Sequence, residues 1–235
     1  MSKTNPMQFA AVIAVFLTAL FVGCGEPDRE IIIPEGMNAE ELNELGIRYD
    51  TWDGIEQDKK AAVKCFQLAA DRGHAGAQMN LGAALFLGEG IRKNEAEAVK
   101  WFRKAAEQGF AMAQNNLGMC YFDARGVAQD KAEALKWMHQ SADQGYAEAQ
   151  YNMGHFCRRG DGVAQDKAEA AKWYRKAADQ GYVPAQNNLG MCYLFGDGVA
   201  QDDANAVIWL GKAAAGGDKS SQAALDWIKA GKPPR

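Results

Sequence analysis

Glycine recurs in this sequence at a fixed spacing of 36 residues, and this period constrains the fold more than any other feature. Three such columns hold 15 of the 25 glycines. They lie at 46, 82, 118, 154 and 190; at 54, 90, 126, 162 and 198; and at 73, 109, 145, 181 and 217. Tryptophan keeps the same period at 101, 137, 173 and 209, and segments 113–130 and 185–202 are identical at 14 of 18 positions. Such a period is typical of a repeat array.

Each 36-residue unit contains two stretches with helical periodicity. In the unit at 110–145, apolar residues at three- and four-residue steps predict a first helix over about Met112–Ala124. A second amphipathic stretch predicts a helix over Lys131–Gln144. The predicted fold is therefore all-α, an α-solenoid of antiparallel helix pairs that stack on their neighbours.

The predicted ends of the second helices carry capping residues. Asn94, Asp130 and Asp166 precede these helices, and each is followed three residues later by a glutamate, which is the pattern of a capping box. The glycine column containing Gly145 is expected to end the second helices, because glycine adopts the left-handed conformation at low cost.

The glycine column containing Gly118 lies inside the first helices, where glycine costs about 1 kcal/mol relative to alanine. Its recurrence predicts a close approach of the second helix at this point. We expect the opposing surface to be the small pair Ala105–Ala106 and its equivalents, Ser141–Ala142 and Ala177–Ala178.

The N-terminal region has the pattern of an export signal rather than of the fold. An apolar run from Phe9 to Val22 follows an early lysine and is shorter than the about 20 residues that span a bilayer. The run ends in "FVGC", which resembles the lipobox of bacterial lipoproteins, although Phe21 stands where that pattern prefers leucine. The resemblance implies a signal at 1–23, lipidation of Cys24 and a tether at 24–37. The alternatives are an ordinary cleaved signal and an uncleaved anchor over Met7–Gly25.

The unit sequence "AQNNLGMCY…GDGVAQDKAEAAKWYRKAADQGY" resembles the Sel-one-like repeat, a relative of the tetratricopeptide repeat with a longer loop between its two helices. The resemblance covers about 38–230. It implies a degenerate repeat at 38–73, full repeats at 74–109, 110–145, 146–181 and 182–217, and a C-terminal capping helix and tail at 218–235. It also implies a right-handed superhelix with the first helices lining its concave side.

The cysteines that follow Cys24 are predicted to be unpaired. Cys120 and Cys157 fall on adjacent first helices, whose axes are expected to lie about 8–10 Å apart, whereas a disulfide needs Cα atoms at about 4.4–6.8 Å. Cys65 falls on a second helix. We therefore expect Cys65, Cys120, Cys157 and Cys192 to be buried small apolar residues.

The sequence shows no pattern of catalytic or metal-binding residues. It lacks H-E-x-x-H, C-x-x-C and G-x-S-x-G, and its three histidines, His74, His139 and His155, occupy different places in the repeat. The "GEG" and "GDG" segments recur as turns with no preceding strand. We expect no cofactor and no metal site, and His155 near Cys157 lacks further ligands. The formal charge of −4 and the pI near 5.5 argue against binding of nucleic acid.

The candidate binding residues form a column of asparagines on the first helices. Tetratricopeptide relatives often have an asparagine at this place, facing the groove, and an amide can pair with the backbone or C-terminal carboxylate of a peptide. The alternative is a structural asparagine bonded to the neighbouring repeat. Methionine and histidine one turn away would suit adaptable binding or core packing equally. The candidates are Asn80, Asn116, Asn152, Asn188, Met119, His155 and Met191.

The tryptophan column, Trp101, Trp137, Trp173 and Trp209, is predicted to be core rather than an aromatic ligand cage, because its spacing places it on the inner face of the second helices.

Three classes of function fit the sequence. The favoured one is a non-catalytic scaffold of the bacterial cell envelope that binds a protein or peptide on its concave face. It would be lipid-anchored to the outer membrane or to the periplasmic face of the inner membrane. No aspartate follows Cys24, which favours the outer membrane. The alternatives are a β-lactam- or cell-wall-binding or hydrolysing enzyme, as in a cysteine-rich branch of the family whose cysteine pairs this sequence lacks, and a regulatory adaptor.

Overall fold

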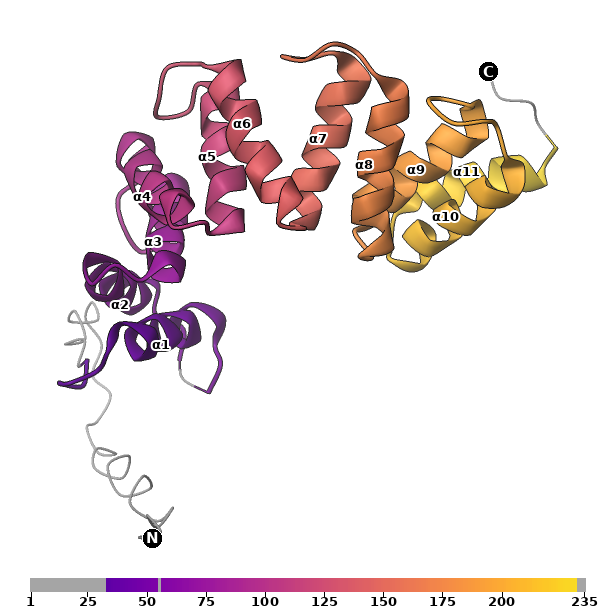
Figure 1. Ribbon diagram of the computed structural model, residues 1–235. Coiled ribbons are helices and arrows are strands. Elements are labelled where there is room, and N and C mark those ends of the chain that lie inside the picture. The colour runs from indigo at the N-terminus through magenta and orange to yellow at the C-terminus, as the bar shows by residue number, and fades with distance from the viewer. Residues whose placement is uncertain (1–32, 55, 232–235) are drawn as a thin grey trace, which may run out of the picture. The chain divides into compact units, whose positions relative to one another are not determined.

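The computed structural model describes residues 33–54 and 56–231, so the expected signal and Cys24 lie outside the described residues. The described residues form eleven α-helices and contain no strand. In chain order (Figure 1) the helices are α1 (Ala39–Thr51), α2 (Lys59–Asp71), α3 (Ala75–Leu87), α4 (Glu95–Glu107), α5 (Ala111–Asp123), α6 (Lys131–Asp143), α7 (Ala147–Arg159), α8 (Lys167–Asp179), α9 (Val183–Phe195), α10 (Asp203–Ala215) and α11 (Lys219–Lys229).

The helices are arranged as stacked pairs. The main packing contacts join helices that are adjacent in sequence: within each pair, such as α5 with α6, and between a second helix and the next first helix, such as α6 with α7 (Figure 1). The predicted all-α solenoid of helix pairs is confirmed. We call the surface formed by α1, α3, α5, α7 and α9 the A-helix face.

Only one of the two hydrogen bonds of each predicted capping box is formed at the start of these second helices. The side chains of Asn94, Asp130 and Asp166 accept a hydrogen bond from the backbone N–H three residues later. The reciprocal glutamate bond is absent there, so the expectation of a full capping box was wrong for these helices. The cap N–H already donates to a first-helix carbonyl, as Asp130 N does to Tyr121 O at 3.0 Å. Glu133 and its equivalents pair with a lysine three residues later instead.

A reciprocal capping box is formed at Asn38, the residue before α1. The Asn38 side chain accepts from Glu41 N, and the Glu41 carboxylate accepts from Asn38 N at 2.8 Å. The glycines that follow the second helices have φ between +86° and +92°, as the left-handed C-terminal position predicts: Gly73, Gly109, Gly145, Gly181 and Gly217.

The glycine inside each first helix lies against the second helix of its own pair. A Cβ on Gly118 would lie 2.5 Å from Met138 Cγ and 2.8 Å from the Ala134 carbonyl oxygen. The close approach is therefore confirmed, but the expected opposing pair was wrong. Ala105–Ala106 belongs to the previous repeat, where the Ala106 carbonyl accepts from Gln114 Nε2 at 3.2 Å. The residues opposite the glycines form an apolar column on the second helices: Phe66, Phe102, Met138, Tyr174 and Leu210.

The core confirms the prediction for the cysteines and most of that for the tryptophans. The four described cysteines are buried and unpaired, and Trp101, Trp173 and Trp209 are buried. Trp137 is half-buried, which differs from the prediction. In the three buried cases the lysine three residues later lies over the indole ring, at 3.7 Å for Lys176 over Trp173, and shields its outer edge.

A ladder of glutamines, buried on the first helices and exposed after the second helices, joins successive repeats. In each of four first helices a glutamine donates to the last turn of the preceding second helix, as Gln150 Nε2 does to Ala142 O at 3.1 Å. In three of these repeats the glutamine that follows the next second helix donates to the first glutamine, as Gln180 Nε2 does to Gln150 Oε1 at 2.8 Å, whereas Gly216 stands at this place after Gln186. The ladder satisfies amide and carbonyl groups that would otherwise be buried without partners. The four first-helix glutamines are Gln78, Gln114, Gln150 and Gln186.

Candidate functional site

Two of the four candidate asparagines bond to the neighbouring first helix. Asn80 Nδ2 donates to Asn43 Oδ1 at 3.1 Å, and Asn152 Nδ2 donates to Asn115 Oδ1 at 3.0 Å. Both bonds join α-helices that are successive members of the A-helix face. At these two positions the amide donor therefore stabilises the packing between repeats.

The other two asparagines lack such a partner because the facing residue differs. Asn116 faces Met79, and its Nδ2 lies 4.0 Å from the Met79 sulfur, a weak acceptor. Asn188 has Tyr151 at the corresponding position, and its amide lies beside the Tyr174 hydroxyl of α8 instead of bonding to the previous first helix. The Asn116 and Asn188 amides are therefore available to a ligand.

Each of these two asparagines lines a cavity on the A-helix face. The first, the α3–α5 cavity, has a volume of about 280 Å³. Its lining includes Phe86, Leu87, Phe102, Asn116, Met119 and Arg125. The second, the α7–α9 cavity, has a volume of about 560 Å³. Its lining includes Arg158, Lys167, Tyr174, Asn188, Met191, Phe195 and Asp197. Asn116 and Asn188 are 72 residues apart, so the cavities occupy equivalent places two repeats apart.

One repeat position differs in size between the two cavities and the repeat that separates them. Cys120 and Cys192 line the two cavities, and Phe156 occupies the equivalent position in the repeat between them. The Phe156 ring packs against Phe122 of α5 with ring centroids 4.5 Å apart. A phenylalanine therefore fills the space between α5 and α7 that a cysteine leaves open in the neighbouring repeats.

Ion pairs between repeats give the two cavities different charges. In α2, α4, α6 and α8 the first residue of the helix pairs with the loop of the next repeat. The pairs are Lys59–Glu89 at 3.0 Å, Lys131–Asp161 at 2.6 Å and Lys167–Asp197 at 2.7 Å, with the polarity reversed in Glu95–Arg125 at 2.6 Å.

In the α7–α9 cavity two cations meet one carboxylate. Lys167 Nζ contacts Asp197 Oδ1 at 2.7 Å, and Arg158 Nε contacts Asp197 Oδ2 at 2.9 Å. The hydrogen bonds from Lys167 and then Arg158 hold the pKa of Asp197 below its usual value. Both carboxylate oxygens are thus engaged, and the three groups leave one net positive charge in the cavity.

The α3–α5 cavity is more apolar. The Arg125 guanidinium lies over the Phe86 ring, 3.8 Å from its centroid, and is paired with Glu95. Hydrogen bonds from Arg125 and Lys93 hold the pKa of Glu95 below its usual value. Leu87 is an exposed apolar residue at the rim.

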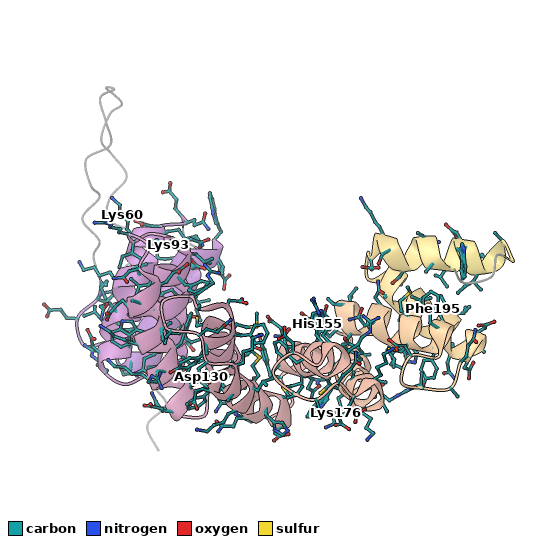
Figure 2. The ribbon with its side chains drawn as sticks, turned by 90° about the horizontal axis from the view of Figure 1, so that it is seen from above. Lys60, Lys93, Asp130, His155, Lys176 and Phe195 are labelled. Carbon is teal, nitrogen blue, oxygen red and sulfur yellow. The ribbon has the colours of Figure 1, made fainter. Side chains whose placement is uncertain are left out.

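Met119 and Met191 line the same cavities as Asn116 and Asn188, whereas His155 lines neither cavity. Met119 lines the α3–α5 cavity with Asn116, and Met191 lines the α7–α9 cavity with Asn188. His155 lines neither, and its ring lies 6.4 Å from those of Tyr151 and Phe156. Burial, and then the nearby charges of Arg159 and Arg158, lower the pKa of His155. Figure 2 shows His155 and Lys176 on opposite sides of the α7–α8 pair.

Of the α7–α9 cavity residues named above, only Asn188 and Met191 were predicted from the sequence. The residues not predicted are Arg158, Lys167, Tyr174, Phe195 and Asp197. Comparison of the repeat columns could have found Tyr174, because it places the only hydroxyl in a column otherwise made of phenylalanine, methionine and leucine. Arg158 likewise stands in a column with Phe86, Phe122 and Leu194. A polar side chain at a repeat position that is apolar in the other repeats is therefore the feature of the sequence that could have indicated these two cavity residues.

The described thiols and histidines are not arranged for nucleophilic catalysis. Burial raises the pKa of Cys65, Cys120 and Cys192 to about 11, and also raises that of Cys157. These thiols are therefore protonated at neutral pH and are poor nucleophiles. The hydrogen bonds of the histidine rings within residues 33–54 and 56–231 go to Glu40, Asp143 and a backbone N–H, not to a hydroxyl or thiol.

The part of the chain that the structure describes contains neither a metal-binding cluster nor a membrane-spanning helix. It holds no group of three or more His, Cys, Asp or Glu side chains placed to bind a metal ion. Within the same residues, no helix has the length and apolar character required to cross a bilayer.

The geometry and repeat length identify the class as a helical-repeat solenoid, and a family comparison specifies which one. The model of the Sel1 repeat matches this chain five times, at 42–74, 75–110, 111–146, 147–182 and 183–218. The chain belongs to the Sel1 repeat family.

Solved structures share this fold. A protective antigen present in uropathogenic Escherichia coli strains, which displays an SLR fold, is 37% identical with a TM-score of 0.74; the match covers 81% of this chain and 41% of the antigen. A Sel1 repeat protein from Oxalobacter formigenes is 35% identical with a TM-score of 0.75, covering 81% and 76% of the two chains. This chain therefore spans less than half the length of the E. coli antigen.

A more distant structure shows the fold alone. An immunity protein from Pseudomonas aeruginosa is 19% identical with a TM-score of 0.57, and the match covers 78% of this chain and 67% of the immunity protein. A search of curated proteins finds no match.

Proposed function

We propose that this protein is a non-catalytic scaffold of the bacterial cell envelope that binds a segment of a partner protein on its A-helix face. The observation that carries the proposal is the pair of equivalent cavities, each with an asparagine amide that the repeat packing leaves available and a methionine beside it. Asn116 with Met119, and Asn188 with Met191, would be the two points of contact.

The chemistry of these cavities suits a peptide. An amide can donate to a peptide carbonyl and accept from a peptide N–H, so it pairs with the backbone of an extended segment. Methionine is flexible and polarizable and adapts to different side chains. The filled space at Phe156 lies between the cavities, so a bound segment would cross it and place side chains in the openings on either side.

The absence of catalysis is supported by the state of the candidate nucleophiles. A thiol whose pKa is raised to about 11, as in Cys120 and Cys192, is not activated for attack. The four cysteines that the structure describes are also unpaired, unlike those of the cysteine-rich branch to which the alternative enzymatic function belongs.

The proposed location is the outer membrane, with a lipid on Cys24 as the anchor and no nucleic-acid partner. The lipobox-like "FVGC" supports the anchor. The 37% identical relative is a protective antigen, a property that suits a protein outside the cytoplasm.

Mass spectrometry of the full chain after expression in a Gram-negative bacterium tests the anchor. We expect the mature protein to begin at Cys24 and to carry the mass of a diacylglyceryl group and an N-linked acyl chain. The variant Cys24→Ala is expected to lack this mass. A mature N-terminus elsewhere, or an unmodified Cys24, would contradict the lipid anchor.

Comparison of two double variants tests the binding face. The full chain, purified with any envelope proteins bound to it, is compared with Asn116→Ala plus Asn188→Ala, which removes both available amides. Loss of two hydrogen bonds worth about 1 kcal/mol each is expected to lower recovery of the bound partner about tenfold or more. Within the protein the Asn116 amide has only the Met79 sulfur beside it and the Asn188 amide only the Tyr174 hydroxyl, so stability should change little.

The control is Lys100→Ala plus Lys172→Ala. These lysines are exposed on the second helices and pair only with the glutamate three residues before them. The control should recover the partner as the unaltered protein does. Equal recovery by both double variants would remove Asn116 and Asn188 from the binding role.

A further inference from the structure

The outward face of α10, the last second helix of the stack, is apolar along its whole length (Figure 1). Five residues fall within an arc of about 100° on a helix of about 3.6 residues per turn, opposite the side that is buried. None of the five has a polar side chain, and four of them are exposed. We call them the α10 stripe: Ala204, Val207, Ile208, Gly211 and Ala215.

Comparison of the repeats shows that three of these positions are apolar in α10 alone. Ile208 stands where each of the other four second helices has a lysine, and Ala215 stands where each has an aspartate or a glutamate. Gly211 stands where the others have glutamine, arginine or histidine. Val207 is 42% exposed and Ile208 is 53% exposed. One second helix has thus exchanged a charged, solvated face for an exposed apolar one, which is typical of an interaction surface.

Gly211 has no packing role among the described residues. It lies inside α10, where glycine is less favourable than any residue except proline. A Cβ on Gly118 would collide with the second helix of its pair, but no described atom lies within 4 Å of a Cβ on Gly211. The described part of the protein therefore does not require this glycine. A glycine on an exposed helix face allows another backbone to approach closely.

The stripe continues a row of contacts that joins successive second helices. At the position of Gly211, His139 of α6 meets the Trp173 ring of α8 with centroids 5.7 Å apart, and the Arg175 guanidinium lies 5.5 Å from the Trp209 ring centroid. The described chain has no second helix after α10, so the next member of this row is missing. The α10 stripe therefore has the place and the apolar character of an interface between helices.

The neighbouring helix α11 is protected, whereas the α10 stripe is not. Asp226 of α11 stands in the column of Gly190, where a Cβ would lie 2.7 Å from Leu210 Cγ of the paired second helix. An exposed aspartate at this point prevents a second helix from packing on α11 in the usual way. The polar face of α11 is what the end of a solenoid requires. The absence of any such charge from the α10 stripe indicates that a partner covers it.

The stripe is complementary to a second copy of itself. If two copies of α10 pack antiparallel about a two-fold axis midway between residues 208 and 211, Ile208 of one copy lies opposite Gly211 of the second copy. The alanines at the two ends of the stripe then lie opposite each other. The largest side chain of each copy thus meets the glycine of the other, as in close helix packing.

The charges at the ends of α10 favour the same arrangement. Asp202 and Asp203 stand at the start of the helix, whereas Lys212 lies in its last turn and Lys219 follows soon after. Antiparallel packing places the acidic start of each copy beside the basic end of the other and aligns the helix dipoles favourably. Parallel packing would place like charges and the two Ile208 side chains together.

We propose that the protein forms a two-fold symmetric homodimer in which the α10 stripes of two copies pack antiparallel, with their closest approach at Gly211. This interface lies on a second helix, so it is separate from the A-helix face and does not depend on its binding function. One helix from each copy buries a small area, and we expect a dissociation constant of about 10 µM.

Sedimentation equilibrium of the full chain in density-matched mild detergent tests the dimer. Between about 1 and 200 µM, the mass is expected to rise from one chain to two. Ile208→Lys introduces the lysine of the other second helices, and Gly211→Arg introduces the arginine of α4 and α8. Each is expected to raise the dissociation constant at least about tenfold. Because arginine and lysine favour a helix more than glycine and isoleucine, the melting temperature should stay unchanged or rise.

The matched control for added charge is Ala223→Arg on α11. Ala223 is exposed and lies outside the α10 stripe. This variant should dimerise as the unaltered protein does.

Disulfide linking in membranes isolated from expressing cells tests the antiparallel arrangement without detergent. Ala204→Cys and Ala215→Cys are expressed separately and together, and the membranes are oxidised with copper phenanthroline. We expect a linked dimer from the coexpressed pair and little from either variant alone, because only residues 204 and 215 lie opposite each other. The unaltered protein gives the background, since its four described cysteines are buried. Ala223→Cys coexpressed with Ala215→Cys is the control and should give only this background.

Three results would overturn the proposal. They are a single chain at every concentration, a dimer that Ile208→Lys and Gly211→Arg leave intact, and linking by each cysteine variant alone as efficiently as by the pair. If the chain is monomeric and Ile208→Lys releases a different protein that copurifies with the unaltered chain, the α10 stripe binds that protein and the homodimer is wrong. None of these results bears on the A-helix face, whose test is the loss of its partner by Asn116→Ala plus Asn188→Ala.

Discussion

Replacement of Gly198 with alanine is expected to lower the free energy of unfolding by about 2–5 kcal/mol. Gly198 follows Asp197 in the loop between α9 and α10 and has φ +78°. A Cβ there would lie 2.0 Å from the Lys167 carbonyl oxygen and 2.3 Å from the carbonyl carbon. The left-handed conformation costs an alanine about 1–2 kcal/mol, and displacement of the α8 backbone adds about 1–3 kcal/mol.

The matched control is Gly162→Ala at the equivalent position one repeat earlier. Gly162 has φ +82°, but the nearest atom to its Cβ is Leu135 Cδ1 at 2.9 Å, the end of a flexible side chain. We therefore expect a cost of about 1–2 kcal/mol, because only the backbone conformation is unfavourable. Urea unfolding followed by tryptophan fluorescence compares the two. Equal losses would contradict a backbone collision at Gly198.

The same substitution has a consequence for the candidate site. Asp197 precedes Gly198 and holds both Lys167 and Arg158. Movement of this loop away from α8 would separate the carboxylate from the two cations. The glycine period that predicts the fold therefore also fixes the charged side of the α7–α9 cavity.

The helices were predictable because their determinants are local. Periodicity gave the α5 and α6 bounds within about one residue, and glycine marked the ends of the second helices. Only the N-cap side-chain hydrogen bond of each capping box was predicted correctly. The glutamate bond does not form because the cap N–H donates to a first-helix carbonyl, which is a tertiary contact. The residues opposite Gly118 were wrongly predicted for the same reason. The spacing indicates that the second helix packs closely at this glycine, but it does not identify which residues of that helix make the contact.

The candidate site was less predictable because it depends on contacts between repeats. The four asparagines are equivalent in sequence, yet Asn80 and Asn152 bond to an asparagine on the previous first helix while Asn116 and Asn188 face Met79 and Tyr151. What differs is the residue that faces each asparagine, which stands 37 positions earlier in the chain on the previous first helix. Interpretation of each helix by itself does not take this residue into account. The cavities likewise depend on whether one column holds cysteine or phenylalanine.

Replacement of Trp173 with alanine is expected to lower the free energy of unfolding by about 3–5 kcal/mol. Trp173 is 5% exposed, its outer edge is shielded by Lys176, and its ring meets His139 of α6 edge-on with centroids 5.7 Å apart. It therefore joins the second helices of two successive repeats. Because a solenoid is stabilised by its nearest-neighbour interfaces, the loss should be greatest in α6–α8.

Trp52→Ala is the matched control, because Trp52 is 65% exposed and its truncation should cost less than about 1 kcal/mol. Thermal unfolding compares overall stability, and amide hydrogen exchange of the Trp173→Ala variant locates the loss. We expect faster exchange in α6–α8 than in α1 and α2, since the interface that is lost does not reach the N-terminal repeat. An unchanged melting temperature for Trp173→Ala would mean that the tryptophan column does not support the core, and the column would then have to be reconsidered as a ligand-binding surface.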